Sequence, residues 1–497
     1  MKSRLIAFSS LLITSILLFS GCATEPSLYT GKTGYYAYTW DQELALGKKS
    51  DTEIVQQMGL YPDDGLSEYV KGIGHDLLEK SAFHQEDTPE IYQDTDFVFR
   101  VLDSPVVNAF ALPGGFVYVT RGLLAHLNNE AQLAVVIGHE ITHVEARHAS
   151  QQALKQQWGQ IGLLAGAIIG EQVAENKELA RQMVDLSGSL FQLMTLKYGR
   201  DAERESDFHG VEYATKAGYD ASEGSAFFRS LKRISEKSGQ TIPSWMSSHP
   251  DPGERETTIA ELSRKWETGG GGEPIVGQRQ FFNHIEGLIV GQNPREGFVS
   301  EGRFLHPELS FQFDIPTGWK VQNERSAVYL AEPNGTALLA LTPASQDSPF
   351  ASVQALAERL KVSPSYAGEE LVNGLPAYAL EGTVTTQNGQ IPIYAQAIEY
   401  QGSVYQFLGY GSPASYPVHR QSIAQTARSF QELRDAAAKS IQPYRLTIEP
   451  ASRSATFREL LPDRLPPDMD AQDWAIMNQV ELDDRIEKGT LLKLPTQ

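Results

Sequence analysis

Cysteine is almost absent from this chain: Cys22 is the only one among 497 residues. A single cysteine excludes a disulfide within the chain. A free thiol would also be a liability in an oxidising compartment, whereas a thioether-linked lipid would explain a count of one. The residues that precede Cys22 therefore decide how it is interpreted.

Long apolar runs are missing as well. Residues 5–19 form an apolar run behind two basic residues, but they are too few for a membrane-spanning helix. The run ends at Ser20-Gly21-Cys22, which is typical of a bacterial lipoprotein signal peptide (1–21) that is cleaved before a lipidated Cys22. The residue after Cys22 is Ala23 and not the aspartate that retains lipoproteins in the inner membrane. Similarity to lipoproteins sorted to the outer membrane therefore suggests the periplasmic face of that membrane. Ordinary secretion with a free thiol is the alternative.

Positive charge is scarce: 42 Lys and Arg stand against 62 Asp and Glu, a formal net charge of −20. No concentrated basic run is present. This balance argues against nucleic acid and against an anionic membrane surface as partners. It also means that acidic substrates are not expected as a class.

The most informative residues are His-Glu-Ile-Thr-His at 139–143. On a helix, residues four apart share a face, so His139 and His143 can bind one ion while Glu140 reaches a water on that ion. This is the arrangement of zinc hydrolases, in which the metal acidifies the water and the glutamate takes its proton before attack on a peptide carbonyl.

The residues around this motif favour a helix. Asn128 or Asn129 is a suitable N-cap, and apolar residues from Leu133 onward recur at helical spacing. Gly138 would let another backbone approach closely. The alternative is a buried helix whose histidines satisfy local hydrogen bonds.

A third metal ligand must come from elsewhere. A metzincin would have glycine at 146 and histidine at 149, but the chain has Ala146 and Ala149, which excludes that class. His148 lies about 140° round the helix from the motif, so we expect it at the surface or behind a ligand. Glu203 and Asp207 are four apart, so one can bind metal while the other orients a ligand histidine. A solvated acidic helix face is the alternative.

With these residues the chain resembles the zinc metallopeptidases that include the CaaX prenyl protease and the heat-shock protease HtpX. It is most similar to the periplasmic beta-barrel assembly-enhancing protease branch. The family joins a His-Glu-x-x-His helix to a second helix carrying Glu-x-x-x-Asp. The resemblance implies one Zn²⁺ per chain, held by His139, His143 and Glu203, with Glu140 as general base and Asp207 supporting a ligand.

Two further segments match the family. Asn108-Ala109-Phe110-Ala111 begins a run that resembles the family's strand beside the cleft; an edge strand there can pair with an extended substrate, although a structural hairpin is the alternative. His249-Pro250, with Arg255 six residues after the histidine, resembles a loop near the metal. Two roles stay open for His249, a fourth ligand that keeps the enzyme latent or a donor to substrate, and Arg255 is expected to stabilise the oxyanion.

The order of patterns predicts an α+β chain. A lipid tether (22–39) precedes a mainly helical zincin-type peptidase domain with a short edge-strand sheet (40–268) and a linker (269–300) that starts with four glycines. A β-rich α/β sandwich resembling PsbP and Mog1 follows (301–440). The last part (441–497) is a β-α-α-β module that resembles a degenerate LysM peptidoglycan-binding unit, with a structural cap as the alternative.

Two points of organisation bear on partners. The tetratricopeptide repeats that follow the peptidase domain in the assembly-enhancing branch have no counterpart in this sequence, so docking to outer-membrane assembly machinery is not assumed.

The apolar stretch 158–174 is too short to span a bilayer. Three interpretations stay open for it: a lid over the cleft, a helix in the lipid surface, or core packing.

We therefore expect a lipid-anchored periplasmic zinc endopeptidase that degrades misfolded or stalled envelope proteins. Its partners would be those unfolded proteins and the membrane, through lipidated Cys22. The alternatives are a chaperone or assembly factor for outer-membrane proteins with a latent site, and a peptidoglycan-associated scaffold.

Overall fold

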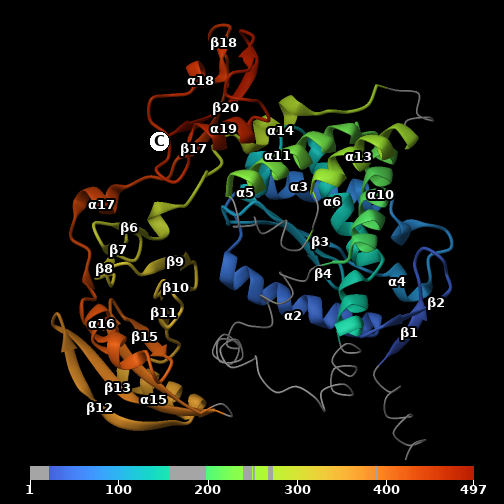
Figure 1. Ribbon diagram of the computed structural model, residues 1–497. Coiled ribbons are helices and arrows are strands. Elements are labelled where there is room, and N and C mark those ends of the chain that lie inside the picture. Colours follow the sequence, from blue (N-terminus) through green and yellow to red (C-terminus); the bar gives the residue numbers. More distant parts are fainter. Residues whose placement is uncertain (1–21, 157–197, 239–248, 250–251, 267–272, 387–388) are drawn as a thin grey trace, which may run out of the picture.

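A computed structural model describes residues 22–156, 198–238, 249, 252–266, 273–386 and 389–497. The predicted signal peptide (1–21) and the apolar stretch 158–174 lie outside these residues. Among the helices that are described, none is both long and apolar enough to cross a membrane. The predicted α+β class is confirmed: a helical domain precedes a β-rich region (Figure 1).

The segment behind Cys22 is an ordered hairpin, in contrast to the predicted tether of 22–39. Strands β1 (Ala23–Pro26) and β2 (Thr33–Tyr36) pair antiparallel. The hairpin packs on the motif helix, because Tyr29 Oη donates to Glu145 Oε2 at 2.6 Å and Arg147 Nη1 donates to Glu25 Oε2 at 2.6 Å. These partly buried polar contacts, which the sequence pattern does not reveal, hold the segment against the domain.

A three-stranded sheet lies next to the motif helix, in the order β3-β5-β4 with β4 at an edge. Strand β5 runs parallel to β3 and antiparallel to β4. Gly47 allows a helix to pack closely on the turn after β4, since a methyl group there would meet the Pro113 carbonyl. The elements of this part are α2 (Trp40–Met58), α3 (Asp64–Leu78), η1 (Ala82–His84), α4 (Glu90–Gln93), β3 (Val98–Leu102), β4 (Ala109–Leu112), β5 (Phe116–Thr120) and α5 (Arg121–His126).

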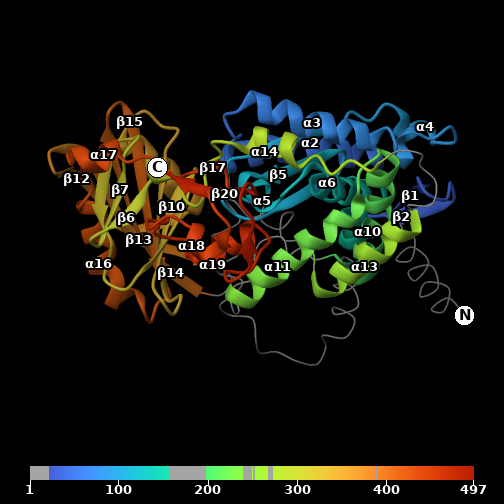
Figure 2. The same cartoon turned by 90° about the horizontal axis from the view of Figure 1, so that it is seen from above.

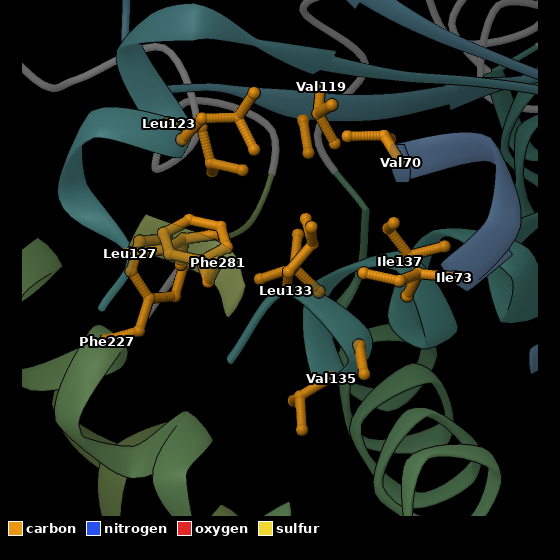
Figure 3. Packing of buried hydrophobic residues seen from close by; sticks show 14 of the residues in the cluster. Val70, Ile73, Val119, Leu123, Leu127, Leu133, Val135, Ile137, Phe227 and Phe281 are labelled. Carbon is orange, nitrogen blue, oxygen red and sulfur yellow. The ribbon is translucent and has the colours of Figure 1, made fainter. Parts of the chain in front are cut away.

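Helix α6 (Glu130–Glu145) is the centre of the helical domain, and every residue in it is buried. Its N-cap is Asn129, whose side chain accepts from the backbone of Gln132. Figure 3 shows Leu133 and Ile137 of α6 packed near Val70 and Ile73 of α3. On the other side α6 contacts α10 (Arg200–Lys216), η2 (Ala221–Glu223) and α11 (Gly224–Ser238). Helix α13 (Pro252–Trp266) belongs to the same layer of helices (Figure 2).

The predicted linker (269–300) is largely part of this domain rather than a spacer. Helix α14 (Gln278–Ile285) buries Phe281, Phe282 and Ile285 in the same core as α6. Arg121, paired with Asp103, donates to the carbonyls of Ile289 and Gly291. The apolar side chains of α14 therefore place the end of the helical domain near residue 290.

In its described residues, 301–386 and 389–440, the predicted sandwich has two antiparallel sheets and the helices α15, α16 and α17. Helix α15 covers one face of the large sheet, and α16 with the small sheet covers the other. The large sheet has the order β12-β13-β14-β15-β11-β10-β9, and the small sheet β16-β8-β7-β6. The elements are η3 (Pro294–Glu296), β6 (Phe298–Ser300), β7 (Arg303–His306), β8 (Phe311–Asp314), β9 (Lys320–Glu324), β10 (Ala327–Ala331), β11 (Ala337–Pro343), α15 (Pro349–Leu360), β12 (Val362–Val372), β13 (Leu375–Thr386), β14 (Gly389–Tyr400), β15 (Ser403–Gly411), α16 (Tyr416–Arg428), β16 (Gln431–Glu432) and α17 (Ala436–Ser440).

The C-terminal module (441–497) shares its core with the helical domain. Phe457, Trp474 and Leu492 belong to the same buried cluster as the apolar residues of α6. Lys493 Nζ, fully buried, donates to the carbonyls of Ala125 and Leu127. The elements are β17 (Arg445–Pro450), β18 (Ala455–Thr456), α18 (Phe457–Leu460), α19 (Ala471–Met477), β19 (Arg485–Ile486) and β20 (Leu491–Thr496), with β17 paired to β20.

Candidate metal centre

Two helices cross closely enough to form the site because each has a glycine at the contact. A methyl group on Gly138 of α6 would lie 2.9 Å from the Gly210 carbonyl oxygen of α10, and one on Gly210 would lie 2.8 Å from the backbone nitrogen of His139. The close approach predicted for Gly138 is thus present. It brings the first histidine of the motif to the acidic face of α10.

The three predicted metal ligands and His249 meet at one point. His139, His143, Glu203 and His249 each offer a ligand atom, and these atoms all lie within 4.8 Å of one another. The Nε2 atoms of His139 and His143 are 3.0 Å apart, and each is 3.6 Å from an oxygen of Glu203. Donors at about 2.1 Å from one tetrahedral zinc ion lie roughly 3.4 Å apart, so these side chains fit the predicted ion.

His249 lies inside this group rather than beside it. Its Nδ1 is 3.0 Å from Glu203 Oε1 and 3.3 Å from His139 Nε2, and its Nε2 is 3.6 Å from Glu140 Oε1. The side chain is buried. Its distances are those of a fourth ligand candidate, one of the two roles that the sequence left open.

Glu140 is completely buried on α6, next to the ligand group. Burial and the charge of Glu203 raise its pKa to about 7, against the opposing effects of His249 and Arg255. Such a pKa suits a group that exchanges protons with a water near neutral pH.

Asp207 and Arg255 contact the metal-binding side chains His139 and Glu203. Asp207 Oδ1 lies 3.0 Å from His139 Nδ1, and Arg255 Nε donates to Asp207 Oδ2 at 2.9 Å. Arg255 Nη1 also lies 3.0 Å from Glu203 Oε2. Burial opposes ionisation of Asp207, but Arg255 and His139 outweigh it and lower the pKa to about 2. The geometry thus directs Arg255 toward two carboxylates, which differs from the predicted oxyanion role.

The predicted substrate-binding residues lie at the edge strand beside the site. Ala109, Phe110 and Ala111 belong to β4, and Asn108 precedes it with its backbone N–H donating to Thr120 Oγ1. All four are buried, and Asn108 Oδ1 has no hydrogen-bond partner among the residues that the structure describes. The backbone of Ala111 contributes to the pKa of Glu140, so β4 runs past the candidate base.

Two aromatic neighbours of His143 complete the site. Tyr198 stacks on its ring with centroids 4.1 Å apart, and His148 lies against its far nitrogen. Tyr198 was missed by sequence reasoning, because a tyrosine two residues before a helix has no pattern of its own. His148 was weighed only as a surface or supporting residue, and its spacing from the motif was the one available signal.

The helical domain and its cluster of two histidines, a base and a carboxylate define a metallopeptidase class. Residues 67–263, which contain all of these side chains, match the model described as Peptidase family M48. The predicted family, the predicted peptidase class and the predicted zinc centre are thereby confirmed for this part of the chain.

Curated relatives are similar over the same region. The chain is 29% identical over 231 residues to the "Putative beta-barrel assembly-enhancing protease" of Vibrio cholerae, covering 46% of this chain and 45% of the relative. It is 31% identical over 233 residues to the "Metalloendopeptidase OMA1, mitochondrial" of Bos taurus (44% and 43%) and 27% identical over 220 residues to the "Beta-barrel assembly-enhancing protease" of Escherichia coli K12 (43% and 42%). The match spans less than half the length of each relative.

A solved structure is similar to about a quarter of this chain. The solution structure of cyanobacterial PsbP from Synechocystis is 14% identical, covers 27% of this chain and 96% of its own, and has a TM-score of 0.23. At this score the likeness decides nothing about the sandwich. The predicted resemblance to PsbP and Mog1 stays a prediction.

Proposed function

We propose that this protein is a zinc endopeptidase that cleaves misfolded or stalled proteins of the bacterial envelope. The observation that carries the proposal is the buried group of His139, His143 and Glu203 with Glu140 beside it. Bound zinc would polarise a substrate carbonyl and acidify a water. Glu140 would take the proton of that water and deliver it to the leaving amine.

The remaining residues would support this reaction. Asp207 would fix the ring of His139 by accepting from Nδ1, which leaves Nε2 available to bind the metal. Arg255 keeps Asp207 and Glu203 ionised and oriented. Asn108 to Ala111 would bind an extended substrate through main-chain hydrogen bonds at the β4 edge, which makes recognition tolerant of sequence.

The proposed location is the periplasmic face of the outer membrane, with Cys22 carrying the lipid. The lipobox-like residues before Cys22 and the bacterial relatives named as beta-barrel assembly-enhancing proteases support this location. The hairpin of β1 and β2 would then hold the helical domain close to the membrane surface, because β1 begins at Ala23, directly after Cys22. Unfolded envelope proteins and the membrane are the proposed partners.

A second candidate, a chaperone or assembly factor with a mostly latent site, is favoured by one observation. His249 occupies the place of a fourth ligand, where a catalytic water would otherwise bind. The third possibility is a peptidoglycan-associated scaffold. The strand and helix order of the C-terminal module supports it. Its α19 side, however, packs on the helical domain, as a structural cap would. A cell-wall pull-down of the intact chain, with and without competing soluble peptidoglycan fragments, tests that possibility.

The decisive experiment compares wild type with Glu140→Gln on an unfolded casein substrate, with and without a chelator. We expect the variant to retain one zinc per chain and to lose at least about 100-fold in rate, because proton transfer is removed while the ligands stay. Glu261→Gln, an exposed glutamate on α13, is the matched control and should behave as wild type. Equal proteolysis by Glu140→Gln and wild type would exclude Glu140 as the base.

A further inference from the structure

His148 faces the second metal-binding histidine although the sequence spacing should turn it away. Its Nδ1 lies 2.9 Å from His143 Nδ1, and its Nε2 lies 3.2 Å from Glu205 Oε2. Only 4% of its surface is exposed. His148 therefore stands between a buried ligand and a carboxylate at the edge of α10.

The backbone explains this placement. Helix α6 ends at Glu145, and Arg147 adopts a left-handed conformation with φ of 55° before the chain becomes helical again at His148. This break swings His148 back over His143. Arg147 is fixed in the unusual conformation because its guanidinium binds Glu43, Glu25 and the carbonyl of Tyr38.

The direction of the hydrogen bonds follows from the ligand atom that His143 uses. A histidine that binds metal through Nε2 must be neutral and carry its proton on Nδ1. His143 Nδ1 therefore donates to His148 Nδ1, which leaves the proton of His148 on Nε2 and directs it to Glu205. One tautomer of each ring satisfies every contact.

We propose that His148 and Glu205 are positioning residues for the metal centre, acting on His143 as Asp207 acts on His139. The inference deepens the proposed function, since it takes His143 as a zinc ligand. The two supports differ in length: Asp207 reaches its histidine directly, whereas Glu205 does so through the imidazole of His148. Because α10 carries Glu203, Glu205 and Asp207, one helix supplies a ligand and orients both histidines of the motif.

The test measures zinc affinity by competition with a chelator, without any peptide substrate. His148→Leu should weaken zinc binding about 10- to 100-fold, as the loss of such a partner does in other metal sites. His148→Asn should recover most of this loss, since its amide oxygen can accept from His143 Nδ1. Glu205→Ala should weaken binding, and Glu205→Gln, which still accepts from His148, should not.

Two controls separate positioning from packing. The unfolding temperature of the metal-free protein reports any general damage, and His126→Leu removes another histidine, one whose ring bonds the Gly122 carbonyl away from the site. Wild-type affinity in His148→Leu would overturn the inference. Equal losses in His148→Leu and His148→Asn, matched by equal losses of metal-free stability, would also overturn it. A wild type that binds zinc but cleaves no polypeptide would instead refute the proposed function alone.

Discussion

His249 is the residue on which the choice between an active and a latent enzyme depends. Its two ring nitrogens face Glu203 and Glu140, so it can fill the fourth ligand position. We predict that His249→Ala weakens zinc affinity about tenfold and raises the rate of casein cleavage per bound zinc, because a water can then bind. Metal titration and a casein assay measure both effects. Unchanged affinity and unchanged rate would argue against a fourth ligand.

Lys493 makes stability depend on pH far from the metal centre. It is fully buried, and burial lowers its pKa well below 10.5. Between the folded and the unfolded pKa the unfolded chain binds the extra proton, so the free energy of unfolding increases as the pH rises through this window. The gain ends near the ordinary pKa of lysine. Its slope is at most about 1.4 kcal/mol per pH unit.

Lys493→Met removes the titrating group and keeps an apolar chain of similar length. We expect the difference in unfolding temperature between wild type and Lys493→Met to shift in favour of wild type as the pH rises toward the ordinary pKa of lysine. Differential scanning fluorimetry at several pH values measures it. Parallel curves for the two proteins would contradict the lowered pKa of Lys493.

At the scale of elements, the crossing of α6 and α10 sets the geometry of the site. A methyl group on Gly210 would lie 2.8 Å from the backbone of His139, a distance that forces the helices apart. We predict that Gly210→Ala lowers stability by about 1–3 kcal/mol, the usual range for overpacking. It should also weaken zinc binding, because Glu203 and Asp207 move away from the motif histidines.

The matched control for this crossing is Gly72→Ala. Gly72 also lies in a helix, but a methyl group there meets nothing within 4 Å. We expect Gly72→Ala to raise stability by about 0.4–1 kcal/mol, through the reduced freedom of the unfolded chain. If both variants behave alike in unfolding and metal titration, the close crossing is not what determines the site.

Elements with local signals could be predicted from the sequence, and those held by distant contacts could not. The apolar spacing after Asn129 marks α6, and the motif itself places His139, Glu140 and His143. No local signal shows that Arg147 breaks the helix, since the partners that stabilise its conformation lie about 100 residues away. For this reason the sequence left open whether His148 lies at the surface or behind a ligand, and the structure places it behind His143.

The predicted linker and tether differ from the structure for a related reason. Four glycines indicate a flexible break at 269–272, but the apolar side chains of α14 just beyond them return to the core of the helical domain. The helix has eight residues, too few for a clear period. The hairpin behind Cys22 was hidden likewise, because it is held by side chains of Glu145 and Arg147 rather than by a core of its own.

At the scale of the whole molecule, the sandwich is an insertion into one continuous core. The backbone N–H of Val290 donates to the Tyr444 carbonyl, and the N–H of Leu446 donates to the Leu288 carbonyl. The chain thus leaves the helical domain and returns beside its point of exit. Figures 1 and 2 show the sandwich to one side, while the C-terminal module lies against the helical domain.

This architecture predicts that the sandwich can be removed while the module cannot. Replacing residues 293–441 by a short Gly-Ser turn should leave one zinc per chain and change the unfolding temperature by no more than roughly 4 °C, about 1 kcal/mol. Deleting 441–497 instead strips Trp474 and Leu492 from the shared core, where each large apolar side chain contributes about 2–5 kcal/mol, and should leave an unstable protein. Zinc analysis and thermal unfolding of both variants measure the contrast. A soluble, zinc-loaded protein lacking the module, or an unfolded one lacking only the sandwich, would show that the core is divided elsewhere.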